Sequence, residues 1–456
     1  MKKTTLTIFA AGLLSVTGLK AQTVQEGMNH LYAQRYKSAA GVFEKILAVN
    51  PNNIEATYWL GQTYLDMDEI MSSRLATARQ LYEKAIQTTN GAPLIQVGLG
   101  HVELLENKMA EARQHFETAL TLTRNSRKGD DPVIETAIGR AIADSKNGDF
   151  NYAVKLLEDA ASKDPKNTET LLQLGNAWRK AGEGRGGGPA FQAYEKALTV
   201  NPNFAVANYR RAMIFASQKN WEPYLKYLNE AIAKDPKFTP AYYELFYYYW
   251  FWQQDYPQAE SYLNKYIESK LPDQDIQDQY LYGQLCWGRK DFTCAVAKAE
   301  SVVQSMGDKT KPKVYRLLAD ANFQKGDYAN AKKNSDLFFL KKNPEDITLY
   351  DYQLRADILG KSGGTDEEVV TTYLDGMTID TLANLKIDLL KKGIVFFKEK
   401  KVPAKQVLLI TKIIELKPKA TINDYFDLMK AYYDLDSNSK SRDLAIVIRD
   451  QDPDHV

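Results

Sequence analysis

The feature that most constrains this chain is a pattern that returns about every 34 residues. Its clearest copy runs from Ala205 to Pro236, and the pairs Asn201-Pro202 and Asp235-Pro236 place its two prolines 34 residues apart. Two stretches with apolar residues at helical spacing lie inside it, separated by a polar break at Gln218–Asn220. Isolated helices of this length are marginal in water. The chain is therefore expected to be a stack of helical hairpins, each covering the apolar face of its neighbour.

Further copies lie on both sides of this one. Asn50-Pro51 and Asp164-Pro165 end similar second helices, and the 37 residues from Pro165 to Pro202 are one period plus a glycine-rich insertion at 183–189. Small residues also recur at two places in each copy, where the helices of a hairpin would cross. This period and these cues resemble the tetratricopeptide repeat (TPR) family. The small pairs are Gly27/Ala39, Gly61/Ala78, Gly100/Ala112, Ala141/Ala153, Gly175/Ala190, Gly283/Ala295 and Ala319/Ala331.

The family also places a bulky residue four positions after the second small one, where it fills the space between the helices. The unit at 205–236 departs from the pattern with Tyr224 at its second small position, and the next unit has Phe246 at its first. After residue 345 the units at 347–380, 384–418 and 421–453 are repeats by period and helicity only. The bulky fillers are Phe43, Tyr82, Phe116, Leu157, Tyr194 and Leu228.

The sequence thus predicts an all-α fold, a right-handed α-solenoid of about 12 TPR-like helical hairpins. None of the polar breaks between copies is long enough for a flexible linker, so one continuous solenoid is expected. We divide it into units 1–4 at 22–165, units 5–9 with an aromatic-rich centre at 168–345, and degenerate units 10–12 at 346–456.

Residues 1–21 have the pattern of a secretory signal peptide. Lys2 and Lys3 give a basic start, an apolar run extends from Leu6 to Leu19, and a small-residue cleavage site ends at Ala21. The run is too short to span a bilayer. No cysteine lies near the cleavage point, so a lipid anchor is not expected. We expect an exported chain in the periplasm, not membrane-spanning, either alone or peripheral to the outer membrane in an envelope complex.

The composition offers little support for enzymatic or nucleic-acid chemistry. With 59 basic against 58 acidic residues, no strong field attracts nucleic acid or membrane. The four histidines are dispersed along the chain, and no HExxH motif, nucleophile elbow or P-loop is present. The glycine run at 183–189 follows a helix and lacks the Lys-Ser/Thr of a phosphate loop. The chain is therefore predicted to be non-enzymatic, with no metal, cofactor or nucleic-acid partner.

Cys286 and Cys294 are the only cysteines, one on each helix of the eighth unit. In an antiparallel hairpin these positions flank the turn, and an oxidising compartment would favour a disulfide there. Two buried thiols are the alternative, because Cys294 stands beside a small-residue position. The spacing is not C-x-x-C, so a redox-active pair is not expected.

Aromatic residues concentrate in the middle of the chain, above all in the predicted helix at 241–252. In the TPR family, first-helix residues at positions two, five, nine, twelve and thirteen line the concave surface. Contiguous exposed aromatics mark binding surfaces, although here the rings could instead fill the inside of a tight bend and touch only each other. The mapping predicts these partner-binding residues: Tyr209, Met213, Tyr243, Tyr247, Trp250, Phe251, Tyr280, Trp287 and Phe323.

The chemistry of this surface suggests a ligand class. Carboxylate-clamp TPR proteins use Lys and Asn at positions five and nine of one unit, whereas here Asn176 is accompanied by Leu172, with Arg179 and Lys180 nearby. Capture of a C-terminal carboxylate is therefore not expected. An aromatic, nearly neutral groove suits an extended peptide or an amphipathic segment. The predicted function is a non-enzymatic periplasmic scaffold or adaptor that binds a protein partner in its concave groove.

The alternative function is glycan binding at the cell envelope. The helical repeats and aromatic residues resemble those of the TPR-containing starch-binding outer-membrane lipoproteins of gut bacteria. That family requires a lipid-modified cysteine after its signal peptide and builds its sugar site on long insertions between repeats. Neither feature is found in this sequence.

Overall fold

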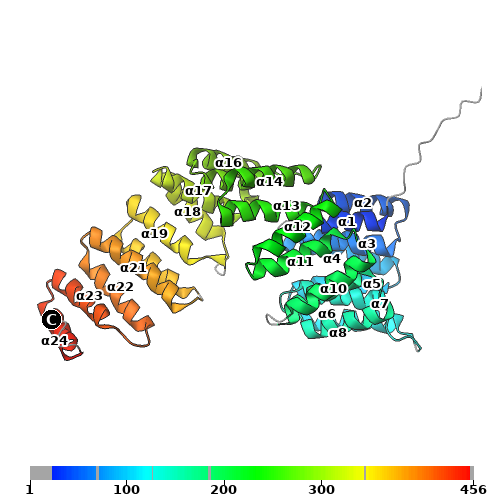
Figure 1. Ribbon diagram of the computed structural model, residues 1–456, viewed down its shortest axis with the longest axis horizontal. Helices are drawn as coiled ribbons and strands as arrows, with labels where there is room; N and C mark the ends of the chain where they lie inside the picture. Colours follow the sequence, from blue (N-terminus) through cyan, green and yellow to red (C-terminus); the bar gives the residue numbers. More distant parts are fainter. Residues whose placement is uncertain are drawn as a thin grey trace, which may run out of the picture. The chain divides into compact units, whose positions relative to one another are not determined.

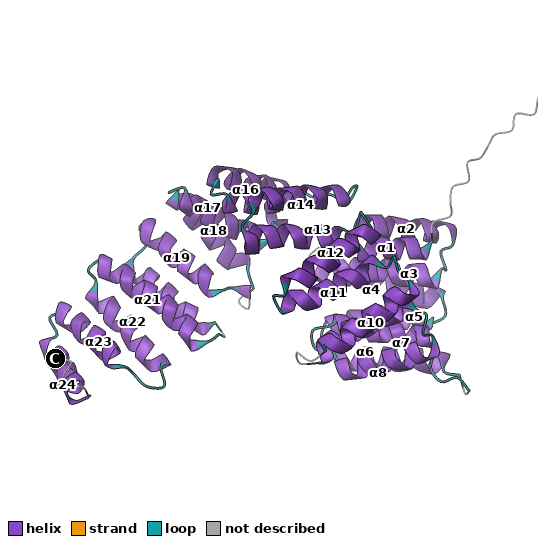
Figure 2. Ribbon diagram, viewed as in Figure 1, coloured by secondary structure: helices purple, strands orange, loops and turns teal. Residues whose placement is uncertain are grey.

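The protein is almost entirely helical, as Figure 2 shows. A computed structural model describes residues 23–67, 71–125, 127–182, 186–343, 346–379 and 381–451. In these ranges the chain forms 24 α-helices, which follow one another as consecutive pairs (Figure 1). The predicted all-α solenoid of about 12 TPR-like hairpins is confirmed. The predicted signal peptide at residues 1–21 lies outside the described residues.

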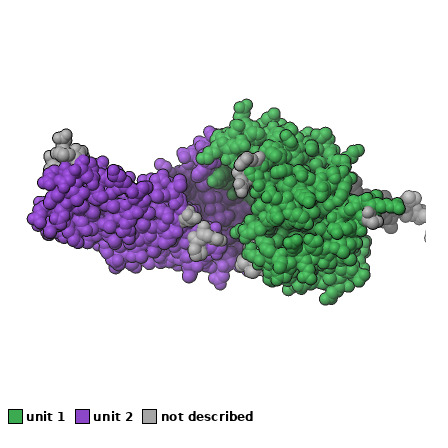
Figure 3. Space-filling model, turned by 90° about the horizontal axis from the view of Figure 1, so that it is seen from below, with its two compact units in different colours: residues 1–248, 261–274 green, residues 249–260, 275–456 purple. Residues whose placement is uncertain are grey.

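The helices gather into two compact units, drawn green and purple in Figure 3. Unit 1 comprises residues 1–248 and 261–274, and unit 2 comprises residues 249–260 and 275–456. The helices of unit 1 are α1 (Val24–Tyr32), α2 (Tyr36–Val49), α3 (Ile54–Asp66), α4 (Met71–Thr88), α5 (Pro93–Leu105), α6 (Met109–Thr123), α7 (Pro132–Asp144), α8 (Phe150–Lys163), α9 (Thr168–Ala181), α10 (Gly187–Val200), α11 (Ala205–Ser217), α12 (Trp221–Lys234) and α13 (Thr239–Tyr247).

Two elements contain residues of both units, a π-helical turn η1 (Tyr248–Gln253) and α14 (Tyr256–Ser269). The remaining helices belong to unit 2. They are α15 (Asp278–Gly288), α16 (Phe292–Met306), α17 (Pro312–Gln324), α18 (Tyr328–Lys341), α19 (Leu349–Lys361), α20 (Asp366–Asp375), α21 (Ala383–Glu399), α22 (Pro403–Leu416), α23 (Ile422–Asp434) and α24 (Asn438–Gln451), with short 3-10 turns η2 (Gly307–Lys309) and η4 (Gly376–Thr378).

The recurring proline motif explains where several first helices begin. Two residues after the proline, Asn53 accepts a hydrogen bond from the backbone N–H of Ala56 and caps α3, and Asn167 caps α9 in the same way. In the next two copies a phenylalanine takes this place, and Phe204 and Phe238 make no side-chain cap. Both rings are buried instead. At the start of α11 and α13, a buried ring therefore stands where α3 and α9 have a side-chain cap.

The small residues and the bulky fillers meet as the TPR resemblance implies. A methyl group added at Gly61 would overlap the ring of Tyr82, and one added at Gly175 would overlap the ring of Tyr194. Both rings are completely buried. A ring can therefore lie directly against the facing helix backbone, which brings the two axes of the hairpin close together. In the fourth hairpin Gly139, two residues before the predicted Ala141, faces the filler Leu157.

In unit 1 the first hairpin contacts hairpins far along the chain. The carboxylate of Asp273, just after α14, accepts hydrogen bonds from the backbone N–H of Ser38 at 2.9 Å and from its hydroxyl at 2.6 Å. On α1, the hydroxyl of Tyr32 donates to Glu169 on α9, and its ring packs edge-on against Phe204 at 6.0 Å between centroids. These contacts join the first, fifth, sixth and seventh hairpins.

The aromatic helix predicted at 241–252 is not a single α-helix. The α-helical part ends at Tyr247, and Tyr248–Gln253 form a π-helical turn. A π turn inserts extra backbone into the helix, so the residues after it leave the 3.6-residue register. The repeat positions predicted for Trp250 and Phe251 assume a regular α-helix, so they do not tell which face of the hairpin these side chains occupy.

The structure joins Cys286 on α15 and Cys294 on α16 by a disulfide, with 5.7 Å between the Cα atoms. This separation lies within the range that disulfides span. The bond closes the turn of the eighth hairpin, whose second helix contributes Ala295 and Ala299 to a hydrophobic core cluster of unit 2.

Candidate functional site

The first helices of the hairpins of unit 1 line two adjacent cavities. One, here called the polar chamber, has a volume of about 410 Å³ and is bordered by α1, α3, α7, α9, α11 and Pro240. The other, the apolar chamber, has about 490 Å³ and is bordered by α1, α3, α5, α7 and α9. Both volumes fall in the range of ligand pockets. Tyr32 and Arg140 line both chambers.

Arg140 is the central charged group of this region. Its guanidinium lies 3.5 Å from the carboxylate of Asp66 on one side and 3.5 Å from that of Glu169 on the other. It also lies 4.7 Å above the ring of Trp59, a cation–π contact. Burial opposes the charge of Arg140, but Tyr32, Glu169 and Asp66 outweigh it and raise the pKa of the guanidinium. Arg140 is thus a fixed, neutralised cation of the wall.

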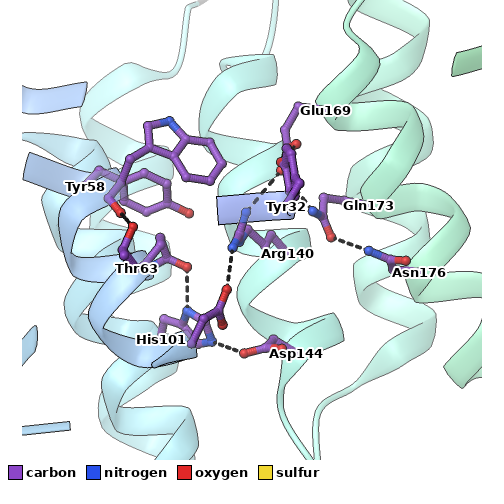
Figure 4. A network of polar contacts seen from close by, with 12 residues as sticks. Tyr32, Tyr58, Thr63, His101, Arg140, Asp144, Glu169, Gln173 and Asn176 are labelled. Carbon is purple, nitrogen blue, oxygen red and sulfur yellow. Dashed lines mark hydrogen bonds and ion pairs between the residues drawn. The ribbon is translucent and has the colours of Figure 1, made fainter. Parts of the chain in front are cut away.

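A chain of hydrogen bonds runs from Glu169 along α9, as Figure 4 shows. Gln173 donates to Glu169 at 2.9 Å, Asn176 donates to Gln173 at 3.0 Å, and the hydroxyl of Tyr194 donates to Asn176 at 2.9 Å. Tyr32 closes the other end through its bond to Glu169. In each amide, the oxygen accepts one hydrogen bond and the nitrogen donates another, so the orientations of both amides are fixed.

A second chain links three hairpins behind the polar chamber. The amide nitrogen of Gln62 donates to the hydroxyl of Tyr82 at 3.0 Å, and its oxygen faces Nδ1 of His101 at 3.0 Å. The other ring nitrogen of His101 lies 3.2 Å from the carboxylate of Asp144. His101 is almost completely buried. It connects α3, α5 and α7 rather than facing a substrate.

The two carboxylates of the polar chamber have opposite pKa shifts. Burial raises the pKa of Asp66 to about 6 although Arg140 opposes the shift, and 32% of the side-chain surface remains open to the cavity. Burial alone would also raise the pKa of Asp144, but the hydrogen bond from His101 and the charges of Arg140 and Lys180 hold it below its usual range. Asp66 is therefore the carboxylate of the chamber that titrates near neutral pH.

The opposite wall of the polar chamber carries cations without carboxylate partners. Arg179 on α9 and Arg210 on α11 line the cavity. Within the described ranges neither has a carboxylate in ion-pair distance, and the buried Nε of Arg210 has no hydrogen-bond partner. The lining contains four cations, Arg140, Arg179, Lys180 and Arg210, against two carboxylates. The chamber thus has an excess of positive charge, located on α9 and α11.

Lys180 is only partly available to a ligand. Its ammonium donates to the backbone oxygen of Ser145 at 2.8 Å and lies 5.3 Å from the ring of Phe150. Burial lowers the pKa of this ammonium, although Asp144 opposes the shift. The groups left for an anionic ligand are therefore the two guanidiniums, whose planar forks match a carboxylate.

The apolar chamber has an aromatic wall. Tyr58 and Trp59 pack edge-on at 5.3 Å between centroids, and Tyr32 and Phe204 form a second edge-on pair. Aliphatic groups also line it, among them Met28, Ile54, Leu94, Val133 and Ala137, together with polar and charged groups that include Arg140 and Glu169. A cavity of this composition favours an apolar group over a charged one.

The nine predicted partner-binding residues are divided between the units. In unit 1, Tyr209 lines the polar chamber, and its ring packs on Phe238 at 5.6 Å. Burial, followed by Glu244, raises the pKa of Tyr209 to about 12. Met213 is partly buried on the same helix. Tyr243 and Tyr247 lie one turn apart on α13, exposed by 37% and 36%.

The other five predicted residues belong to unit 2. The indole N–H of Trp250 donates to the backbone oxygen of Gln284 at 3.0 Å, whereas Phe251 is 48% exposed. Tyr280 and Trp287 on α15 pack against the core of the unit. Phe323 on α17 packs against a small cluster of Ala319, Ala331, Leu354 and Ile358. Tyr280, Trp287 and Phe323 thus pack against core clusters, and the role of the five rings as a partner-binding surface stays a prediction.

The residues that line the chambers were open to the same sequence argument. With Gly61 and Gly175 at the eighth position, the concave positions of the second and fifth units fall on Tyr58, Asp66, Glu169, Asn176, Arg179 and Lys180, all of which line one of the chambers. The polar residues of these two units are scattered along the sequence, so no cluster marks them as a site. The same counting from Gly27 places Tyr32 at the thirteenth position of the first unit, but its contacts with distant hairpins leave no mark in the sequence.

Comparison with known proteins supports the repeat class. Residues 24–93 match the sequence profile of the tetratricopeptide repeat family. The human IFIT1 dimer with m7Gppp-AAAA aligns with a TM-score of 0.50 at 13% identity, over 93% of this chain and 99% of that one. This likeness supports the helical-repeat fold alone. A search of curated proteins returned no match to the sequence.

Two other solved structures are similar at lower scores. A tetratricopeptide repeat protein from Parabacteroides merdae has a TM-score of 0.43 at 21% identity, covering 53% of this chain and 91% of that chain. Yeast Tom70 has a TM-score of 0.43 at 14% identity, covering 94% and 98%.

The repeat pattern, the helical pairs and the family match over residues 24–93 identify tetratricopeptide-type repeats in this chain. None of the helices in the described ranges combines the length and apolar character that a membrane crossing requires. The same ranges hold no group of three or more His, Cys, Asp or Glu side chains placed to bind a metal ion.

Proposed function

We propose that this protein is a non-enzymatic scaffold that binds a segment of a partner protein on the inner wall of unit 1. TPR repeats form frameworks compatible with peptide binding, and the chambers supply a concave surface of ligand size. The observation that carries the proposal is the pair of guanidiniums, Arg179 and Arg210, that face the polar chamber without carboxylate partners. The partner segment is accordingly acidic.

The recognition mechanism is charge pairing in a partly enclosed space. A carboxylate entering the polar chamber replaces its water shell with guanidinium donors, and the amide of Asn176 is fixed nearby by its neighbours. Charge-assisted hydrogen bonds of this kind are stronger than neutral ones. Arg140 does not compete for the ligand, because Asp66 and Glu169 already neutralise it.

A display library of random peptides tests this function. Wild-type protein should select peptides rich in Asp and Glu, and Arg210→Gln should weaken binding of a selected peptide roughly tenfold, the loss expected for one charged hydrogen bond. The adjacent Arg211→Gln is a matched control, since Arg211 pairs with Glu195 and Glu230 and lines neither chamber. Saturable binding of neutral oligosaccharides without selection of acidic peptides would favour the glycan-binding role instead.

We also propose that the protein is exported and acts in the periplasm. The support is the sequence pattern of residues 1–21. Osmotic-shock fractionation of cells expressing the full chain should release the protein with the periplasmic contents, and its N-terminal sequence should begin at Gln22. An N-terminus at Met1 on a protein retained in the cytoplasm would contradict export.

A further inference from the structure

The apolar chamber contains a buried hydroxyl that the fold does not use. Tyr58 is 3% exposed, and its hydroxyl has no hydrogen-bond partner among the described residues. In Figure 4 this hydroxyl is directed towards the side where Arg140 and Tyr32 lie. Buried polar groups are nearly always hydrogen-bonded, so an unpaired one calls for an explanation.

Tyr82 provides a direct contrast within the same hairpin. Its hydroxyl is also completely enclosed, but it donates to the backbone oxygen of Tyr58 at 2.8 Å and accepts from Gln62 at 3.0 Å. The packing therefore satisfies the hydroxyl of one tyrosine and leaves that of the other without a protein partner in the described ranges. A ligand atom in the apolar chamber would supply the partner that Tyr58 lacks.

Tyr32 stands between the two chambers. It lines both of them, and it is held by its bond to Glu169 and its edge contact with Phe204. Arg140 borders both chambers as well. A ligand that follows the inner wall therefore meets a cationic chamber and an aromatic chamber on the two sides of one tyrosine.

We propose that the apolar chamber receives a bulky apolar side chain of the same partner segment whose acidic side chain enters the polar chamber. A backbone carbonyl of that segment accepts a hydrogen bond from the hydroxyl of Tyr58. The inference rests on the proposed function and defines its ligand further, as a peptide in which an apolar residue neighbours an acidic one. The volume of about 490 Å³ accommodates an aromatic or long aliphatic side chain.

Two substitutions in the apolar chamber test the inference with the same peptide display library. Ala137→Leu adds volume to the lining of the chamber on α7 without a change of charge. Tyr58→Phe removes the unpaired hydroxyl and keeps the ring. Because this hydroxyl has no partner in the free protein, Tyr58→Phe should leave the thermal unfolding midpoint unchanged or slightly raised.

Wild-type protein is expected to select peptides that combine a bulky apolar residue with a neighbouring Asp or Glu. Ala137→Leu should abolish the apolar preference and retain the acidic one. Tyr58→Phe should weaken binding of a selected peptide roughly fivefold, the effect of one neutral hydrogen bond. Tyr64→Phe is the matched control, because Tyr64 lies on the same helix, lines neither chamber and bonds Glu44 near the surface.

The outcomes separate this inference from the function on which it rests. The inference is overturned if the selected peptides are acidic but show no apolar preference. It is also overturned if the apolar preference survives Ala137→Leu and Tyr58→Phe leaves the affinity unchanged. Both results leave the scaffold function standing. A failure to select acidic peptides, or selection that Arg210→Gln does not affect, overturns both. If Ala137→Leu does not fold, the comparison of Tyr58→Phe with Tyr64→Phe decides the question alone.

Discussion

The two units are built from the same helical hairpin but differ in how far their contacts reach along the chain. In unit 1, Tyr32 bonds Glu169 across 137 residues and Ser38 bonds Asp273 across 235 residues. Among the described residues of unit 2, the side-chain hydrogen bonds found link nearby hairpins, as between Lys392 and Gln353, 39 residues apart. Repeat proteins ordinarily depend on contacts between neighbours. Unit 1 adds distant contacts and encloses two chambers by them.

Individual hairpins of the two units also differ in what fixes them. Unit 1 places rings such as Tyr82 and Tyr194 against glycines of the facing helices. In the eighth hairpin, in unit 2, Gly283 most closely faces the flexible end of the Leu317 side chain, and the same hairpin carries the disulfide. Other glycines of unit 2, such as Gly393 beside Leu409, are packed closely too, so the contrast is one between the crossings at Gly175 and Gly283.

Reduction of the disulfide should give the largest effect, and it should be confined to unit 2. Opening the short loop between Cys286 and Cys294 is expected to cost roughly 2–4 kcal/mol. Hydrogen exchange followed by mass spectrometry, with and without reductant, should show faster exchange in α15 and α16 and unchanged exchange in α1–α12. Two free thiols per chain in the denatured, unreduced protein would contradict the bond.

Glycine replacement should distinguish the two kinds of crossing. Gly175→Ala is expected to destabilise unit 1 by about 2 kcal/mol, because the new methyl group meets the fully buried ring of Tyr194. Gly283→Ala should change stability by less than about 1 kcal/mol, since Leu317 can move and alanine favours the helix. Chemical denaturation of both variants checks this. Equal losses of stability in the two variants would remove the proposed difference between the crossings at Gly175 and Gly283.

The long-range contact of Asp273 should contribute less to stability than the disulfide or the packing at Gly175. Asp273→Ala removes both acceptors of Ser38 and is expected to destabilise unit 1 by about 1.5 kcal/mol, as for a buried, charge-assisted hydrogen bond. A double-mutant cycle with Ser38→Ala isolates the pair. Losses that simply add in the double variant would show that the two residues are not energetically coupled.

The smallest effect expected is a pH dependence of ligand binding. The pKa of Asp66 is raised to about 6, so its carboxylate is protonated at pH 5 and ionised at pH 7.5. Carboxylates of a bound peptide titrate near 4 and remain ionised across this range. Affinity for an acidic peptide should therefore rise about threefold as the pH falls from 7.5 to 5, since the loss of one nearby negative charge reduces repulsion.

Asp66→Asn is the control for this pH dependence. The charged groups near Asp66 are Arg140, Asp144, His101 and Arg74. Titrations of one selected peptide at both pH values, in wild type and variant, are sufficient. A dependence that persists in Asp66→Asn does not come from the Asp66 carboxylate and would contradict this prediction.

Much of the fold could be predicted from the sequence, because its main determinants are local and repeated. The 34-residue period, the glycine and filler pairs and the proline motifs each recur, so errors at one copy are corrected by the others. The π turn after Tyr247 could not be predicted, since the run of aromatic residues has the composition of an ordinary buried helix. The regular register assumed for Trp250 and Phe251 fails there for that reason.

The candidate site was less accessible to sequence reasoning. Repeat position alone finds Tyr58 and Arg179, as the chambers show. The meeting of Tyr32 with Glu169 depends on the accumulated rotation of four hairpins, to which every crossing contributes a small angle. Likewise, the missing partner of the Tyr58 hydroxyl follows from three-dimensional packing and leaves no mark in the sequence.

The bond between Ser38 and Asp273 has a consequence for how the protein is made. Early hairpins can form as soon as they leave the ribosome or a translocation channel, but this bond must wait until 235 further residues have followed. The wall that Tyr32 completes needs Glu169 and Phe204 to have followed, and the first hairpin lacks its contact with Asp273 for longer still. Contacts between residues so far apart slow folding, so a ligand-competent unit 1 should appear late in biosynthesis, well after most of its helices.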